Sequence, residues 1–195
     1  MDLERTLKDY SEESCRTLLR SPFDRLAEAA GILLEARAAG RWIFSAGNGG
    51  SAATASHFAN DFVKGLSMEG RRRFKVMALN DGIPILTALA NDYDYARCFE
   101  EQLKNYGSSG DVLVVYSGSG NSPNVVRAAE YARSIGMKVV SFGGRDGGRM
   151  RALSDVSCVA ATDSMESIED MHMVWEHALI VALRGVIAAE PESVR

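Results

Sequence analysis

The chain has few of the features that would mark a disulfide-rich, nucleic-acid-binding or membrane protein. Its three cysteines, Cys15, Cys98 and Cys158, lie far apart among 195 residues. This number and spacing exclude a disulfide framework and a cysteine zinc site, so we expect reduced core thiols in a cytoplasmic protein. The net charge of −4 argues against nucleic-acid binding by bulk electrostatics.

Long apolar runs and linkers are also missing. No apolar run reaches the roughly 18 residues that would span a bilayer, which predicts no membrane contact. The first 20 residues are charged and helical in pattern, unlike a secretory signal. Without an internal repeat or a low-complexity segment, residues 1–195 are predicted to form one domain, with residues 1–40 as two N-terminal helices.

Beyond residue 40, short apolar runs alternate with helical patterns. Buried strands are predicted at residues 42–46, 74–79, 111–116, 138–142 and 156–160. A long amphipathic helix is predicted at 167–188. This alternation indicates an α/β fold of three layers, with a five-stranded parallel sheet between helices. Such sheets bind ligands beyond the carboxyl ends of their strands.

The turn after the third predicted strand has the composition of an anion site. It reads Ser-Gly-Ser-Gly-Asn-Ser over residues 117–122 and is followed by Pro123, which suits the first turn of a helix. Glycine lets the backbone approach an anion, and serine hydroxyls and free helix N–H groups donate to it. An ordinary helix cap needs only one serine, so three favour a phosphate site.

A second Gly-rich turn, residues 47–51, follows the first predicted strand. It lacks the third glycine of a dinucleotide fingerprint, and neither turn continues as Gly-Lys-Ser/Thr. These neutral, lysine-free turns suit a phosphomonoester held by hydroxyls and amides.

Histidines are scarce, and two of the three stand near carboxylates. Asp61 follows His57 by four residues, which places both on one helix face. Glu169 precedes His177 by eight residues on the last helix, whereas His172 points elsewhere and is predicted to be structural. Two such helices can build a divalent metal site or an acid–base pair, although His–Asp pairs are also common on surface helices.

Four sequence blocks in this order resemble the sugar isomerase (SIS) domain family and, within it, the phosphoheptose isomerases. They lie at residues 47–58, 117–125, 143–148 and 168–177. The resemblance implies a flavodoxin-like sandwich and a homotetramer with active sites at subunit interfaces. It also implies conversion of sedoheptulose 7-phosphate into D-glycero-D-manno-heptose 7-phosphate through an enediol. Substrate contacts are expected at Asn48, Gly49, Ser51, Asp92, Ser117, Ser119 and Ser122.

The resemblance further implies a zinc ion bound by His, Glu, Gln and His, which map to His57, Asp61, Glu169 and His177. Two of the four depart from the family, because Asp61 replaces the glutamate and Glu169 replaces the glutamine. Glu169 could take over the base or ligand role, or two carboxylates could bind a dication more tightly. The departures could also reflect drift in a binding paralogue.

The catalytic residues expected on this basis are His177 with Asp61 or Glu169. The alternatives are an isomerase or epimerase for another sugar phosphate, a non-catalytic sugar-phosphate-binding protein, and an SIS protein that associates with a replication initiator. The fold does not separate these roles. A pure adaptor has no reason to retain both His57 and His177, which favours the enzyme.

Overall fold

A computed structural model describes residues 2–191 of the chain. Its strands are β1 (Trp42–Ala46), β2 (Lys75–Ala78), β3 (Val112–Ser117), β4 (Lys138–Gly144) and β5 (Val156–Ala160). Its α-helices are α1 (Leu3–Leu19), α2 (Phe23–Ala38), α3 (Gly50–Asn60), α4 (Ile83–Asp92), α5 (Cys98–Tyr106), α6 (Pro123–Ser134), α7 (Gly148–Leu153) and α8 (Met165–Ala189). A π-helical turn, η1 (Asp61–Gly65), follows α3, and a 3-10 turn, η2 (Tyr95–Arg97), precedes α5.

The five strands form one parallel sheet in the order β2-β1-β3-β4-β5. β1 lies between β2 and β3, with Ile43 opposite Val112, so the chain moves outward in one direction after β1 and in the other after β3. Parallel sheets bind ligands at such a switch point. The prediction of a five-stranded parallel α/β sandwich is confirmed.

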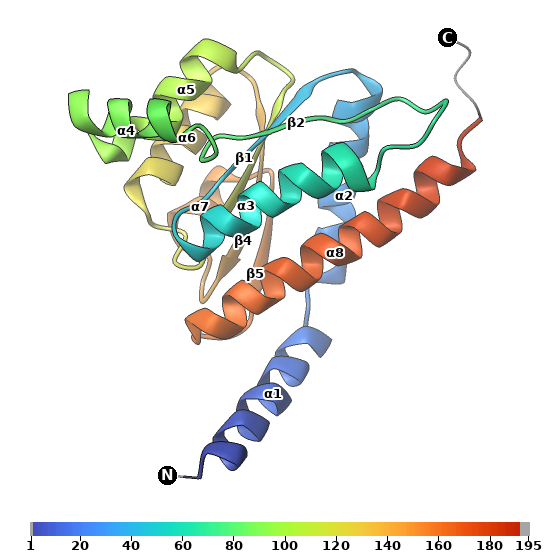
Figure 1. Cartoon of the computed structure of the whole chain (residues 1–195), viewed down its shortest axis with the longest axis vertical. Coiled ribbons are helices and arrows are strands. Elements are labelled where there is room, and N and C mark those ends of the chain that lie inside the picture. The colour runs from blue at the N-terminus through green and yellow to red at the C-terminus, as the bar shows by residue number, and fades with distance from the viewer. Residues whose placement is uncertain (1, 192–195) are drawn as a thin grey trace.

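Helices cover both faces of the sheet and define two cores (Figure 1). On one face, α2, α3 and α8 bury Leu33, Phe58 and Trp175 against the strands. On the other, α5 and α6 bury Phe99 and Val125. β3 is buried along its whole length because helices pack on both of its faces, and this explains its continuous apolar sequence.

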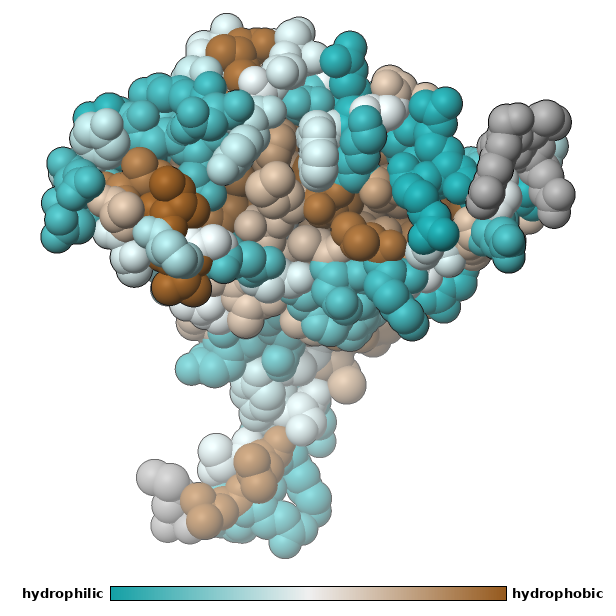
Figure 2. Space-filling view, turned by 45° about the horizontal axis from the view of Figure 1, so that its top comes forward, coloured by the Kyte–Doolittle hydropathy of each residue, from teal (hydrophilic) through white to brown (hydrophobic). Residues whose placement is uncertain are grey.

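α1 extends away from this body as an arm (Figure 1). Two polar contacts tie it to α8: the Tyr10 hydroxyl donates to Asp170 Oδ2 at 2.5 Å, and the Ser14 and Ser167 hydroxyl oxygens lie 3.5 Å apart. Leu3 and Leu7 are each 69% exposed on the arm. Apolar side chains therefore remain uncovered on α1 in the single chain, as the space-filling view also shows (Figure 2).

α8 is the one helix among residues 2–191 whose length and apolar composition would suffice to cross a membrane. The expectation drawn from uninterrupted apolar runs overlooked this helix, because single polar residues interrupt its sequence. Its buried face, which includes Met171, Trp175 and Leu183, packs into the core of the sheet. A helix buried in a protein core can have the same length and apolar composition.

The cysteines differ in part from expectation. Cys98 and Cys158 are buried thiols, as predicted, but Cys15 is exposed. The prediction of a core position for Cys15 was wrong because most of α1 stands off the body, and only its C-terminal end, at Leu18, packs against a core.

Candidate active site

The two Gly- and Ser-rich turns lie side by side, because β1 and β3 are neighbours in the sheet. Together with the first turn of α8 they enclose a pocket of about 330 Å³. The lining residues are Asn48, Gly49, Gly50, Ser51, Tyr116, Ser117, Gly118, Ser119, Ser122, Met165 and Glu169. The pocket therefore contains all the predicted substrate contacts except Asp92.

The turn after β3 requires glycine for a steric reason. Gly120 has φ +63°, and a Cβ there would lie 2.0 Å from the carbonyl oxygen of Gly147. The turn is thus held close against the loop after β4, and the Met150 N–H of α7 also donates to the Gly120 carbonyl at 3.0 Å. This contact fixes the serines before any ligand arrives.

The three serine hydroxyls of this turn keep their protons available. Ser117 Oγ accepts from the N–H of Gly120, and Ser119 Oγ accepts from the N–H of Asn121, each at 3.2 Å. Ser122 precedes α6 but makes no capping hydrogen bond with its side chain. An accepted bond leaves a hydroxyl free to donate, so this turn is more than a helix cap.

An amide pair connects the two turns. Asn48 Nδ2 donates to Asn124 Oδ1 at 2.9 Å, and Asn124 Nδ2 donates to Asn48 Oδ1 at 2.7 Å. The Tyr95 hydroxyl also donates to Asn48 Oδ1, at 2.8 Å, and partial burial raises the pKa of Tyr95, which keeps it a donor. Asn124 and Tyr95 were not singled out from sequence, although Asn124 lies inside a recognised block.

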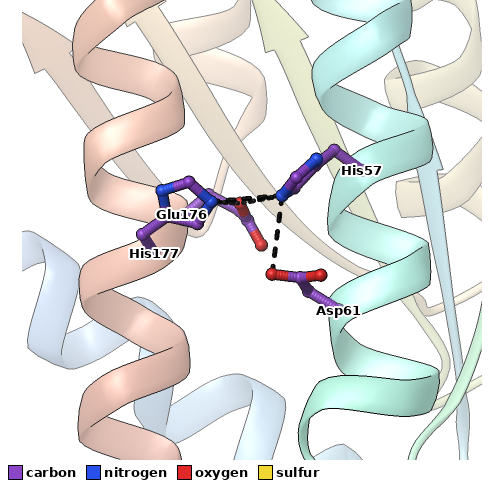
Figure 3. A group of neighbouring side chains, drawn as sticks. All are labelled: His57, Asp61, Glu176 and His177. Carbon is purple, nitrogen blue, oxygen red and sulfur yellow. Dashed lines mark hydrogen bonds and ion pairs between the residues drawn. The ribbon is translucent and has the colours of Figure 1, made fainter.

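A second group of side chains lies between α3 and α8 (Figure 3). The Nε2 atoms of His57 and His177 are 3.1 Å apart. His57 Nε2 lies 3.5 Å from Asp61 Oδ2 and 3.7 Å from Glu176 Oε2, which is 3.6 Å from His177 Nε2. One ligand atom from each of the four residues lies within 4.8 Å of the others, so the group can hold a metal ion.

Asp61 occupies its place through a local change of helix type. α3 gives way to the π-helical turn η1 at Asp61, where the Leu66 N–H donates to the Asp61 carbonyl at 3.0 Å. Such turns widen the helix and occur often at functional sites. The sequence predicted that His57 and Asp61 share one helix face but not this change, because a π-turn has no distinct pattern of side chains.

Glu176 is the member of this group that sequence reasoning missed. Its side chain is fully buried, and neither carboxylate oxygen has a hydrogen-bond partner among the described residues. Burial, together with the nearby Asp61 carboxylate, raises the pKa of Glu176 to about 7. A glutamate one residue from a candidate histidine usually points away from the site, so the sequence carried no clear signal for it.

Glu169 lies apart from His57, Asp61 and His177. A Cβ on Gly50, at the start of α3, would be 2.5 Å from either carboxylate oxygen of Glu169, which places this side chain at the phosphate pocket. The sequence placed Glu169 and His177 on one helix face but ignored their separation of about 12 Å along the axis.

Asp92 and His172 also stand outside the group. Asp92 ends α4, is exposed and accepts from Asn91 Nδ2 at 2.8 Å. His172 is buried and structural in its contacts, donating from Nε2 to the Gly143 carbonyl at 3.2 Å. Burial lowers its pKa to about 4, so it is a neutral imidazole.

α3 and α8 run side by side (Figure 1), and the line of contact between them, here called the α3–α8 seam, has the pocket at one end and the histidine group further along. Gly50 faces Glu169 at one end, and seven residues along each helix His57 faces Glu176. Seven helical residues span about 10 Å, which separates the two sites. The pocket and the imidazoles are thus about 10 Å apart along the helix axes.

The chain is similar to known proteins in sequence. Residues 8–144 match the SIS domain family. A phosphoheptose isomerase of Aliarcobacter butzleri is 38% identical over 168 residues, covering 86% of this chain and 88% of that protein. One from Thermodesulfovibrio yellowstonii is 33% identical over 194 residues, covering 98% of this chain and 96% of that protein.

Solved structures agree. Phosphoheptose isomerase GmhA from Neisseria gonorrhoeae is 31% identical with a TM-score of 0.87, covering 94% of this chain and 99% of that one. The enzyme from Francisella tularensis is 26% identical with a TM-score of 0.89, covering 95% and 100%.

The sheet order, the pocket at its switch point and the match over residues 8–144 define the class: the chain belongs to the SIS domain family. Within that family it belongs to the phosphoheptose isomerases, and it is an isomerase. The resemblance noted from sequence is confirmed.

Proposed function

We propose that the protein interconverts sedoheptulose 7-phosphate and D-glycero-D-manno-heptose 7-phosphate. The observation that carries this proposal is the spacing of the two sites along the α3–α8 seam. A heptose chain spans about 7 Å from C1 to C7, before its phosphate is added, at about 1.2 Å per bond. A phosphate at Ser117, Ser119 and Ser122 would therefore place C1 and C2 beside the histidine group, about 10 Å away.

The reaction moves one proton between C1 and C2 through an enediol, while a second transfer adjusts the oxygens. We assign these transfers to His177 and Asp61. The side chain of His177 is 52% exposed, which leaves its ring accessible to a substrate. Glu169 lies at the phosphate end of the seam, so its role there is to contact hydroxyls nearer the phosphate.

The phosphate contributes binding energy remote from the reacting carbons. Because Ser117, Ser119 and Asn48 are fixed by their own hydrogen bonds, this energy aligns C1 and C2 with His177 and Asp61. Asn48, Gly49 and Ser51 would supply further donors, including the free N–H groups at the start of α3. Asp92 is not among the residues that line this pocket, and we propose that it acts on the pocket of a neighbouring subunit.

The donor set fits a zinc ion, since imidazole nitrogens and carboxylate oxygens are among its usual ligands. His57, Asp61 and His177 would hold it. When bound, it would polarise the substrate carbonyl and stabilise the enediolate.

We propose further that the enzyme works in the cytoplasm as a homotetramer with active sites at subunit interfaces, and that residues 1–40 form part of the contacts. The exposed Leu3 and Leu7 on the α1 arm support this. Replacing Leu7 with Asp should lower the mass measured by light scattering after gel filtration. Replacing exposed Lys8, one residue further along the helix, with Asp serves as the control; an unchanged mass for L7D would contradict the role of α1.

Turnover itself tests the proposed reaction. Purified protein is incubated with sedoheptulose 7-phosphate, with and without a chelator, and the product is followed by NMR. We expect a signal of the aldoheptose phosphate that grows to equilibrium. No turnover in the presence of added zinc would overturn the proposed function.

A further inference from the structure

Glu176 presents an unusual combination of burial and lack of partners. Its carboxylate is fully buried, and both oxygens are without a hydrogen bond among residues 2–191. A buried carboxylate normally has a charged or hydrogen-bonding partner, because leaving one unpaired costs several kcal/mol. This carboxylate instead points at the imidazoles of His57 and His177 (Figure 3).

Four of the six distances among the ligand atoms of the group are close to those of a tetrahedral zinc site, and all six are within 4.8 Å. Four ligand atoms about 2.1 Å from a zinc ion in tetrahedral geometry lie about 3.4 Å from one another. The separations here are 3.1 Å between the two Nε2 atoms, 3.5 Å from His57 to Asp61, and 3.7 and 3.6 Å from Glu176 to His57 and His177. These four separations lie slightly below and slightly above the ideal ligand–ligand separation of about 3.4 Å.

We infer that Glu176, and not Glu169, is the second carboxylate ligand of the metal site in this chain. Glu169 lies about 10 Å further along the seam, against Gly50, and cannot share an ion with His57 in this arrangement. The inference rests on the proposed metal site and adds a ligand that the family resemblance does not assign. Glu176 and His57 take no part in the proposed proton transfer, so they would hold the ion together with Asp61 and His177.

Glu176→Gln tests the assignment, with Glu169→Gln as the matched control on the same helix. Each variant is stripped with chelator and titrated with zinc by calorimetry, and retained zinc is measured after dialysis. We expect E176Q to bind zinc more weakly by at least about 10- to 100-fold, which is the loss seen when a partner behind a metal ligand is removed and therefore a lower bound for a direct ligand. We expect E169Q to bind within about twofold of the parent. Equal binding by E176Q and the parent, or a larger loss in E169Q, would overturn the inference.

Cobalt gives a readout of the ligand set itself. The visible spectrum of the Co²⁺-loaded protein should change in E176Q and stay the same in E169Q. An unchanged spectrum in E176Q would contradict direct coordination, as would failure of the parent to bind either metal.

Thermal unfolding checks that a loss of zinc binding in E176Q does not come from misfolding. Without metal, E176Q should melt at or above the temperature of the parent, because the change removes an unpaired buried carboxylate. With zinc, it should show less of the rise in melting temperature that ligand binding gives the parent. If E176Q melts lower without metal, Glu176→Leu, which also removes the charge, repeats the titration and must show the same loss.

The outcome is separable from that of the proposed function. Turnover of sedoheptulose 7-phosphate with an unchanged zinc affinity in E176Q would retain the function and reject the ligand. Zinc binding that depends on Glu176, in a protein without turnover, would support Glu176 as a ligand and reject the proposed function.

Discussion

The two ends of the α3–α8 seam are built on opposite physical principles. At the phosphate end, backbone N–H groups, hydroxyls and amides bond to one another, as in the Asn48–Asn124 pair. At the histidine end, two imidazoles and two carboxylates meet, and the buried carboxylate of Glu176 has no hydrogen bond. One end is complete before its ligand arrives, whereas the other is stabilised only when a cation or proton joins it.

This difference separates binding from chemistry. A neutral, preformed turn can hold an anion without changing its own protonation. A group of close, titratable side chains can instead exchange protons or bind a dication. Variants at the two ends should therefore alter different kinetic constants.

The largest effect is expected for His177→Ala. Loss of the proposed acid–base imidazole should lower kcat by about 10²- to 10⁴-fold, the usual contribution of such a group, with little change in KM. Steady-state kinetics on sedoheptulose 7-phosphate measure both constants. Activity within threefold of the parent would show that the histidine end is not the reactive one.

Asp61→Asn and Glu169→Gln test whether the two ends of the α3–α8 seam contribute separately to kcat and KM. D61N should lower kcat by about 100-fold, because it removes the carboxylate beside His57 that we assign to proton transfer. E169Q should mainly raise KM, because Glu169 lies at the phosphate pocket. If E169Q lost kcat and D61N lost only KM, the proton-transfer role would belong to Glu169.

His172 provides a pH test on the same helix, away from both ends. Its folded pKa of about 4 lies below the ordinary 6.5, so the unfolded chain takes up the proton first as pH falls. The stability it contributes is present above pH 6.5 and is lost between pH 6.5 and 4, by about 3 kcal/mol in total. Urea unfolding across this range should show a shallower acid loss in His172→Gln, whose amide can still donate to Gly143. A parallel loss in H172Q would remove His172 as the cause.

The smallest effect is expected at the phosphate end. Ser119→Ala removes one hydroxyl donor to a charged group, worth about 1.5 kcal/mol, so KM should rise about tenfold with kcat nearly unchanged. Exposed Ser134, whose hydroxyl donates to the Tyr131 carbonyl on the outer side of α6, is a control for serine loss. A fall confined to kcat would argue against the phosphate role.

The pattern of residues was enough to predict most of the fold. The buried strand β3 and the serine turn after it are consecutive in the chain, so local composition specifies both. The α1 arm was predicted as a helix, but the exposure of Cys15 on it was not, because burial depends on what a helix packs against.

The sequence by itself determined the phosphate end of the site, because its serines and glycines are adjacent and the strand–turn–helix pattern places them at a sheet edge. Only the tertiary structure decided the histidine end. There, the π-turn at Asp61 and the axial register of α3 against α8 bring Glu176 to His57 and leave Glu169 at Gly50. Periodicity gives the face of a helix on which a side chain lies. It does not give the position along a neighbouring helix, which is set by how the side chains of both pack together.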